Sequence, residues 1–177
     1  MTKITLFHGT SQRNAEEIMK KGFIPDKTYN WQVKSKKGFV YLSSAYAPFY
    51  CMSNNAHKLA LIKVEVDTKH LYPEDDFLML VLGKKTYTQS ELDKVDLSKY
   101  KKLWKKSLEY MGNVATRPYN IKIIDVRYFD GSNLIMKCDP VISPINFKIM
   151  GQYYKDLTEW IYEGNDIMKF KSFIYVI

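Results

Sequence analysis

Short apolar segments separated by polar turns recur along the chain, and they limit its fold more than any other feature. The segment 59–67 alternates apolar and polar side chains in its second half, as a half-buried strand does. The helical patterns between these segments are short and irregularly placed, which predicts an α+β domain rather than a doubly wound parallel sheet. The segments that we interpret as strands are 3–7, 38–44, 59–67, 113–116, 121–129 and 133–138.

Two short helices are expected in the first third of the chain. Asn14 stands three residues before Glu17, the spacing of a capping box, and Gly22 follows the last apolar position of that pattern. The first helix should therefore begin at Asn14 and end at Gly22. A second helix within 44–54 should be interrupted at Pro48, because proline lacks a backbone donor.

The clearest helical pattern covers residues 100–111 and stops at Gly112, and a later one ends at Gly164. In the first of these, apolar side chains recur at helical spacing while lysines occupy the rest of the circumference, which predicts one core-facing side and one solvated side. The polar stretch 28–38 is interpreted as an exposed loop, and the carboxylates of residues 73–76 as a solvated turn.

Length and composition narrow the function classes. With 177 residues the chain fits a single domain, with 128–177 as a candidate specificity extension. The formal net charge of +8 favours anionic partners such as nucleic acid, a phosphorylated small molecule or an acidic protein, although coding bias toward lysine would produce the same surplus. No apolar run approaches the roughly 20 residues of a membrane span and no signal peptide is evident, so a cytoplasmic protein is expected.

The sequence contains no pattern that indicates a metal site, a disulfide framework or one of the common catalytic motifs. Cys51 and Cys138 form no CxxC pair or Cys/His cluster, so neither a disulfide framework nor a zinc site is expected. His57 and His70 lie far from each other along the chain and belong to no metal-binding motif, so we expect both to be surface or structural residues. There is also no GxSxG elbow, Walker loop or GxGxxG.

Two groups of residues suggest a ligand site. His8, Gly9 and Thr10 follow the first apolar segment, and Tyr41 lies in the second, so each group should lie where a strand passes into a loop or helix. An imidazole, a glycine that permits close approach and a hydroxyl would suit a nucleotide sugar and carboxamide. The rings of Tyr41 and Tyr50 could stack on a heteroaromatic ring.

The segments "LFHGTSQRNAEEIMKKGFIP" and "GFVYLSSAYAPFYC" together resemble the ADP-ribosyltransferase superfamily of the histidine-tyrosine-glutamate type, which includes poly-ADP-ribose polymerases and diphtheria-like toxins. The resemblance is concentrated in residues 4–51. It implies a split antiparallel sheet with short flanking helices, and NAD as a substrate without any metal.

The resemblance also implies roles for individual residues. His8 would hydrogen-bond the adenosine-side ribose of NAD, and the backbone of Gly9 would hold the nicotinamide carboxamide, with Thr10 close by. Tyr41 would line the nicotinamide pocket and Tyr50 would close its other side. Where the family often has a carboxamide-binding serine this chain has an alanine at position 47, so Ser43 or Ser44 would substitute.

The third family residue, a glutamate that orients the nicotinamide ribose, has no direct counterpart. The matching position falls within 112–114, and Asn113 is the best match. An asparagine can hydrogen-bond a ribose hydroxyl but carries no charge, and such lost electrostatic stabilisation costs on the order of 3 kcal/mol. Other acids that could take the role under a shifted alignment are Glu109, Asp125 and Asp130.

Three functions follow from the resemblance. The first is a mono-ADP-ribosyltransferase that releases nicotinamide from NAD and transfers ADP-ribose to an acceptor protein or nucleic acid. The second is an NAD-dependent RNA 2'-phosphotransferase, which needs arginines to hold phosphate, whereas this chain has only Arg13, Arg117 and Arg127. The third is a catalytically inactive relative that binds or inhibits another molecule, a role that the uncharged Asn113 favours.

Overall fold

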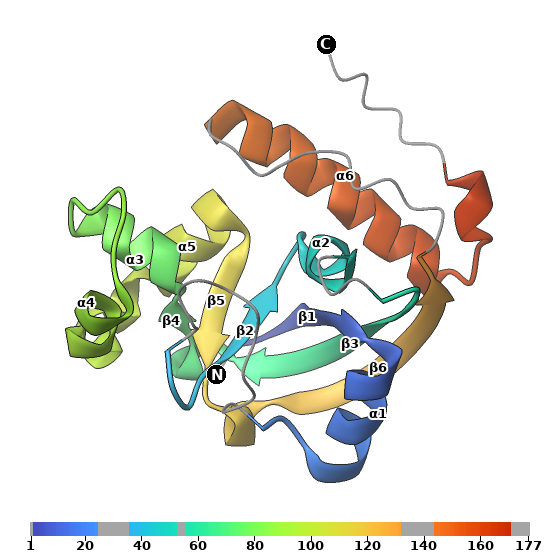
Figure 1. Ribbon diagram of the computed structural model, residues 1–177, viewed down its shortest axis with the longest axis horizontal. Helices are drawn as coiled ribbons and strands as arrows, with labels where there is room; N and C mark the ends of the chain where they lie inside the picture. Colours follow the sequence, from blue (N-terminus) through green and yellow to red (C-terminus); the bar gives the residue numbers. More distant parts are fainter. Residues whose placement is uncertain (1, 25–35, 53–55, 132–143, 171–177) are drawn as a thin grey trace.

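One six-stranded antiparallel sheet forms the centre of the protein (Figure 1). The computed structural model describes residues 2–24, 36–52, 56–131 and 144–170. The order of the strands is β4-β5-β2-β1-β3-β6, which confirms the prediction of an α+β fold built from short elements. The strands are β1 (Lys3–Ser11), β2 (Val40–Ser43), β3 (Lys58–Asp67), β4 (Tyr72–Pro73), β5 (Asn113–Thr116) and β6 (Lys122–Asp130).

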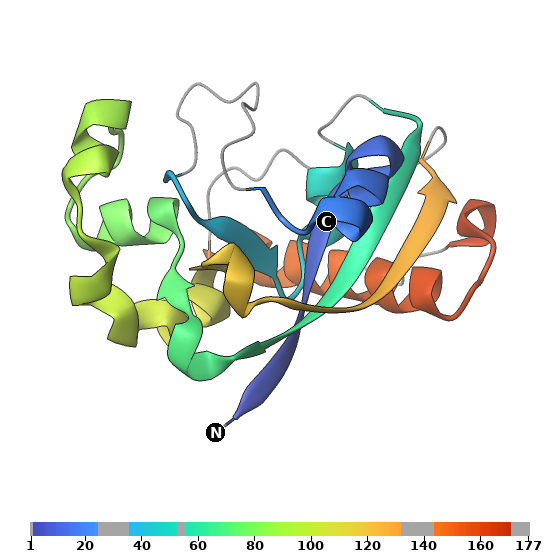
Figure 2. The same cartoon turned by 90° about the horizontal axis from the view of Figure 1, so that it is seen from below.

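Short helices cover both faces and one edge of the sheet. Figure 1 shows α2 and α6 along one face with α1 on the other, and Figure 2 shows α3 and α4 gathered at the end that carries β4. The α-helices are α1 (Gln12–Lys21), α2 (Ala47–Met52), α3 (Asp75–Val81), α4 (Gln89–Lys94), α5 (Trp104–Met111) and α6 (Pro144–Tyr162). The 3₁₀ turns are η1 (Thr68–His70), η2 (Leu97–Leu103), η3 (Pro118–Asn120) and η4 (Ile167–Lys169).

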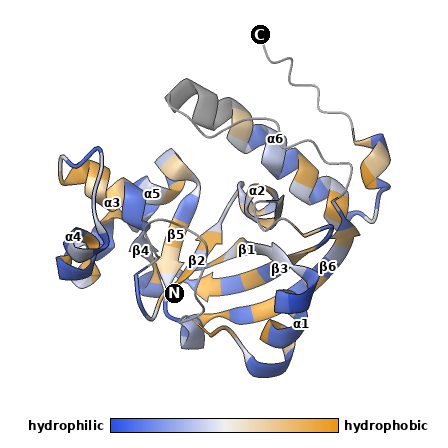
Figure 3. Ribbon diagram, viewed as in Figure 1, coloured by the Kyte–Doolittle hydropathy of each residue, from blue (hydrophilic) through white to orange (hydrophobic). Residues whose placement is uncertain are grey.

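Strand β3 is buried on both faces, because successive side chains point to opposite sides of a sheet. Ala60, Ile62 and Val64 pack in the cluster that includes α1, whereas Leu59 and Leu61 pack in the cluster under α2 and α6. Figure 3 shows apolar and polar residues in turn along β3, and polar residues over much of α1. The two faces therefore hold separate apolar cores.

The first strand and helix differ from the prediction. Strand β1 continues to Ser11, so residues 8–10 lie inside the strand and not at its end. Ser11, not Asn14, is the N-cap of α1, because its extended backbone lets its hydroxyl accept a hydrogen bond from the Asn14 amide at 3.3 Å. The predicted end is confirmed, since Gly22 has φ 75° and its amide donates to the carbonyl of Ile18.

Proline 48 begins a helix instead of interrupting one. It is the second residue of α2, where the amide of a first-turn residue has no intrahelical partner and the missing donor costs nothing. The predicted helix 100–111 is divided into η2 and α5, and its expected stop is confirmed by Gly112 at φ 68°. The predicted strand 133–138, Cys138 and most of the loop 28–38 lie outside the described residues.

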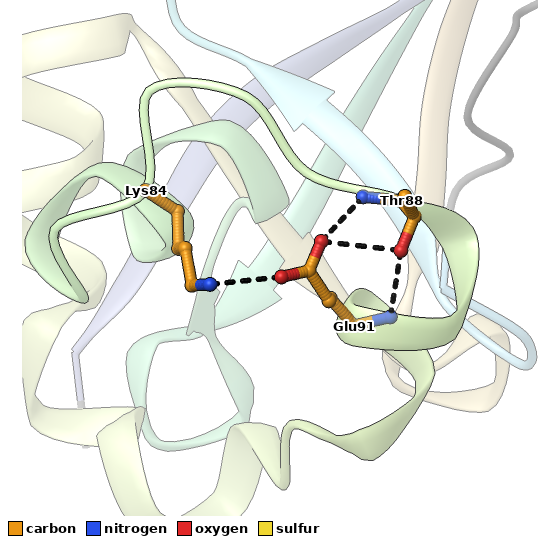
Figure 4. A network of polar contacts seen from close by, with 3 residues as sticks. All are labelled: Lys84, Thr88 and Glu91. Carbon is orange, nitrogen blue, oxygen red and sulfur yellow. Dashed lines mark hydrogen bonds and ion pairs between the residues drawn. The ribbon is translucent and has the colours of Figure 1, made fainter.

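Helices α3 and α4 were not predicted from the sequence. Helix α4 holds Lys36, which precedes β2, through hydrogen bonds at its C-terminal end. Thr88 and Glu91 form a capping box at the start of α4, and Lys84 pairs with Glu91 at 2.8 Å (Figure 4). Lys84 and Thr88 lower the pKa of Glu91 to about 2. At the other end of α4, the Lys36 ammonium donates to the carbonyls of Leu92 at 2.9 Å, Asp93 at 3.3 Å and Val95.

Replacement of the α4 cap should weaken the fold. Thr88→Ala removes the hydroxyl that accepts from the Glu91 amide, and loss of an N-cap of this kind costs about 1 kcal/mol. The free energy of unfolding, measured by urea denaturation, should fall by that amount. Ser90→Ala, an exposed change in the same helix, is the control, and equal stability of both variants would show that the cap does not contribute.

Candidate functional site

Strands β1 and β2 part from each other along the middle of the sheet. Strand β1 pairs with β3 at nine positions, from Lys3↔Asp67 to Ser11↔Leu59, but its ladder with β2 is recorded at Phe7↔Ser43. On its opposite edge β2 pairs with β5 at four positions, from Val40↔Thr116 to Ser43↔Asn113. The backbone of β1 after Phe7 therefore faces β2 without a continuous ladder.

The His8 ring reaches across this parting, and its hydrogen bond fixes which ring nitrogen carries a proton. Its Nδ1 lies 3.1 Å from the carbonyl oxygen of Tyr41, and because a carbonyl only accepts, Nδ1 must carry the proton. Burial lowers the pKa of His8 and favours the neutral ring, although this same hydrogen bond opposes the shift. Phe23 holds the ring edge to face at 5.1 Å. Nε2 is left as a hydrogen-bond acceptor.

Gly9 allows α2 to lie directly against the backbone of β1. A Cβ atom at this position would stand 1.8 Å from the carbonyl oxygen of Ala47 and 2.9 Å from Sγ of Cys51, so no other residue fits without movement of the helix. The adjacent Thr10 is buried, and its hydroxyl accepts from the Asn14 side chain at 3.3 Å. Gly9 and Thr10 therefore have structural roles whether or not a ligand binds.

Ser43 and Ser44 turn the chain from β2 into α2. Both hydroxyls donate to the carbonyl of Gly112, at 3.0 and 3.3 Å. The Ser43 hydroxyl also accepts from the amide of Tyr46 at 2.6 Å. These groups are engaged within the protein, so neither hydroxyl replaces the missing family serine without giving up such a bond.

Asn113 and Tyr50 meet beside this turn. Asn113 lies opposite Ser43 in the β2–β5 ladder, and its Nδ2 donates to the Tyr50 hydroxyl at 2.6 Å. The Asn113 side chain belongs to a residue only 9% exposed, and within the described ranges its Oδ1 has no hydrogen-bond partner. Tyr50 and Asn113, which were assigned to one site from the sequence, are thus in direct contact. The Asn113 Oδ1 atom remains available to accept a hydrogen bond from a ligand.

Tyr41 is bound to an acid that the sequence did not single out. The Tyr41 hydroxyl donates to Oδ2 of Asp75. The Lys36 amide lies 3.1 Å from the Tyr41 hydroxyl oxygen and also 3.1 Å from Asp75 Oδ2. Asp75 is 6% exposed, and its other oxygen, Oδ1, has no partner among the residues that the structure describes. Burial raises the pKa of Asp75 to about 6, although the bonds from Tyr41 and Lys36 oppose the shift.

Glu74 directly follows β4, next to the Pro73↔Val114 pair, and Ser107 connects it to Asn113. The Ser107 hydroxyl accepts from the Glu74 amide at 3.0 Å and donates to the Asn113 carbonyl at 2.8 Å, which joins the end of β4 to the start of β5. The Glu74 carboxylate caps α3 by accepting from the amides of Asp76 and Phe77, at 3.1 and 2.9 Å. Burial raises the pKa of Glu74 well above its usual range.

The prediction that residues 73–76 form a solvated turn is therefore wrong for two of the three acids. Glu74 and Asp75 are buried, and only Asp76 is exposed, where it accepts from the Tyr87 hydroxyl. The sequence did hold a signal for the helix that begins here, although not for the burial of its acids. Three acids followed directly by the apolar run of residues 77–82 are typical of a helix start with an acidic first turn.

The other acids proposed for the catalytic role lie elsewhere. Asp125 and Asp130 are on β6, which is separated from β5 by the three strands β2, β1 and β3. Glu109 is exposed on α5, 3.9 Å from Lys105. His57 is exposed and His70 is partly exposed, and neither belongs to a cluster with His8.

Comparisons of the whole chain with models of protein families, with curated proteins and with solved structures gave no significant match. Among the described residues, no group of three or more histidines, cysteines or acids is arranged to hold a metal ion. Nor is any helix in the described ranges long and apolar enough to cross a membrane. The arguments for function therefore depend on the site itself.

The buried Asp75 carboxyl should make stability depend on pH. Its pKa is about 6 in the folded protein and about 3.9 when unfolded, so the folded state binds the extra proton and unfolding free energy falls as pH rises from about 4 to about 6. The expected loss is on the order of 3 kcal/mol. His8, whose pKa is lowered, acts in the opposite direction, because its contribution is lost as pH falls below about 6.5.

The difference in unfolding free energy between wild type and Asp75→Asn, followed as a function of pH, isolates the contribution of the Asp75 carboxyl. Urea denaturation at several pH values should show the stability of wild type relative to the variant declining from pH 4 to pH 7. Parallel curves would contradict the assigned burial of an ionisable group at this position.

Proposed function

We propose that this protein is an NAD-dependent mono-ADP-ribosyltransferase with the split-sheet fold of that superfamily. The observation that carries the proposal is the order β5-β2-β1, which makes neighbours of the strands bearing Asn113, Tyr41 and His8. Helix α2 adds Tyr50 to the same group through its bond to Asn113. Asn113 was selected from the resemblance alone, and the other three also from their residue types and positions in the sequence. All four come from segments far apart in the sequence.

The parting of β1 and β2 supports a role in binding NAD. The neutral His8 ring presents Nε2 as an acceptor, which suits a ribose hydroxyl. The β1 backbone after Phe7 is free of a continuous ladder with β2, so amide and carbonyl groups near Gly9 are candidates to hold a carboxamide. In this proposal β1 supplies the contacts to both halves of the dinucleotide.

Tyr41 and Tyr50 would hold the nicotinamide ring. Both hydroxyls are anchored, one on Asp75 and the other on Asn113, so each aromatic ring is oriented before a ligand arrives. Such preorganisation lowers the entropy lost on binding. Ser43 and Ser44 would contribute by shaping the turn into α2 and not by direct contact with the ligand.

A catalytically inactive binding protein is the second candidate, and Asn113 is the observation in its favour. A neutral amide beside Tyr50 offers no charge to a developing cation. The RNA 2'-phosphotransferase alternative has less support, because the three arginines are dispersed. Arg13 is on α1, Arg127 pairs with Asp125 at 3.2 Å on β6, and Arg117 stacks on Phe39 and donates to the Gly38 carbonyl.

The decisive experiment measures nicotinamide release from NAD by purified protein, with and without cell lysate as a source of acceptors. We expect release by wild type that increases with lysate. In His8→Ala, loss of a neutral hydrogen bond worth about 0.5–1.5 kcal/mol should reduce release about 2- to 12-fold. His57→Ala, which changes an exposed histidine, should behave as wild type.

Calorimetric titration with NAD separates the two candidate functions. Binding by wild type without nicotinamide release would favour the inactive binding protein. Absence of binding by wild type, or unchanged affinity in both His8→Ala and Tyr41→Ala, would refute the assignment of an NAD site.

A further inference from the structure

We propose that Asp75 is the acidic residue of this site, and that it contacts the nicotinamide-side ribose of NAD from the junction of β4 and α3. It would do so in place of a glutamate on β5, where this chain has Asn113. The inference rests on the proposed transferase function and names the group that supplies its negative charge.

The first support is an unsatisfied oxygen. Asp75 is 6% exposed, and Oδ2 accepts from Tyr41 and from the Lys36 amide, while Oδ1 has no hydrogen-bond partner in the described part of the chain. A buried carboxylate oxygen without a donor is costly. A ligand hydroxyl placed at Oδ1 would remove that cost.

The second support is another unsatisfied oxygen on the same face of the sheet. Oδ1 of Asn113 is also buried and unpartnered within the described ranges. In the β2–β5 ladder Tyr41 lies opposite Ala115 and Ser43 opposite Asn113, so Tyr41 and Asn113 are on the same face of the sheet. Asp75, held by the Tyr41 hydroxyl, is therefore on that face as well. Two spare acceptors on one face suit a ligand with two hydroxyl donors, as in the diol of a ribose.

The neighbouring acids fit this role less well. Both oxygens of Glu74 accept backbone amides at the start of α3, so its carboxylate is committed to the cap. Asp76 is exposed and bonds to the Tyr87 hydroxyl. Asp75 alone among the three combines burial, a bond to a tyrosine of the proposed NAD site and an oxygen that has no hydrogen-bond partner among the described residues.

The chemistry that Asp75 would assist is cleavage of the bond between C1' of the ribose and the nicotinamide nitrogen. Nicotinamide leaves as a neutral molecule with the bonding electron pair, and positive charge develops on the ribose. A ribose hydroxyl that donates to Asp75 Oδ1 brings a carboxylate close to that charge. The acceptor's nucleophilic atom then bonds to C1' and releases its proton to solvent, which completes the transfer.

The test compares Asp75→Asn with Asp76→Asn, two variants that each replace one carboxylate by an amide at adjacent positions. Nicotinamide release is measured over a range of NAD concentrations. We expect kcat to fall about 10²- to 10³-fold in Asp75→Asn with a KM for NAD within about threefold of wild type, because the lost interaction acts mainly in the transition state. Asp76→Asn should retain kcat within about threefold.

A second variant guards against a folding defect. Tyr41→Phe keeps the aromatic ring and removes only the hydroxyl that orients Asp75, so kcat should fall about tenfold with little change in KM. The thermal unfolding midpoint of each variant is measured alongside. If Asp75→Asn does not fold, the Tyr41→Phe kinetics decide, and an unchanged kcat there would overturn the proposal.

The outcomes separate this inference from the function on which it rests. If wild type releases nicotinamide and folded Asp75→Asn does so equally well, Asp75 is not the acid, while the transferase assignment stands. If wild type releases no nicotinamide under any condition, the transferase assignment fails and the role of Asp75 fails with it.

Discussion

The hydrogen bonds among Tyr41, Asp75 and Lys36 connect the parts of this protein on which its candidate site depends. They join β2 to the start of α3, and the Lys36 side chain extends the connection to the end of α4. Each of these groups is buried or partly buried. Removal of one therefore leaves the others without a hydrogen-bond partner in a place where water cannot readily replace it, which costs stability. The edge of the sheet near β4 is thereby held against the strand that carries Tyr41.

The opposite side of the site depends on close packing. The carbonyl of Ala47 occupies the space that a side chain on Gly9 would need, which places α2 and Tyr50 directly over β1. The hydrogen bonds to Asp75 and Lys36 thus position Tyr41, and the contact between Gly9 and α2 positions Tyr50. Burial disfavours the ionised form of the Asp75 carboxyl and raises its pKa, and this lowers the stability of the fold at neutral pH.

Local signals predicted much of the fold. Five of the six predicted strand segments, the glycines that end α1 and α5, and the mixture of short strands and helices are present, while the segment 133–138 lies outside the described residues. The errors arose where two local signals compete. Ser11 and Asn14 can both cap a helix, and Pro48 either breaks a helix or begins one, so the outcome depends on where the preceding strand ends.

The sequence by itself determined the alternation of elements and the candidates His8, Tyr41, Tyr50 and Asn113, because backbone periodicity and motif spacing are local properties. Only the tertiary structure decided which of these side chains meet, and which acid lies beside them. Asp75 is 34 residues from Tyr41 along the chain, and the pairing of β4 with β5 brings α3 to the site. Burial of a carboxylate depends on such long-range contacts, so the pattern of residues 73–76 could not reveal it.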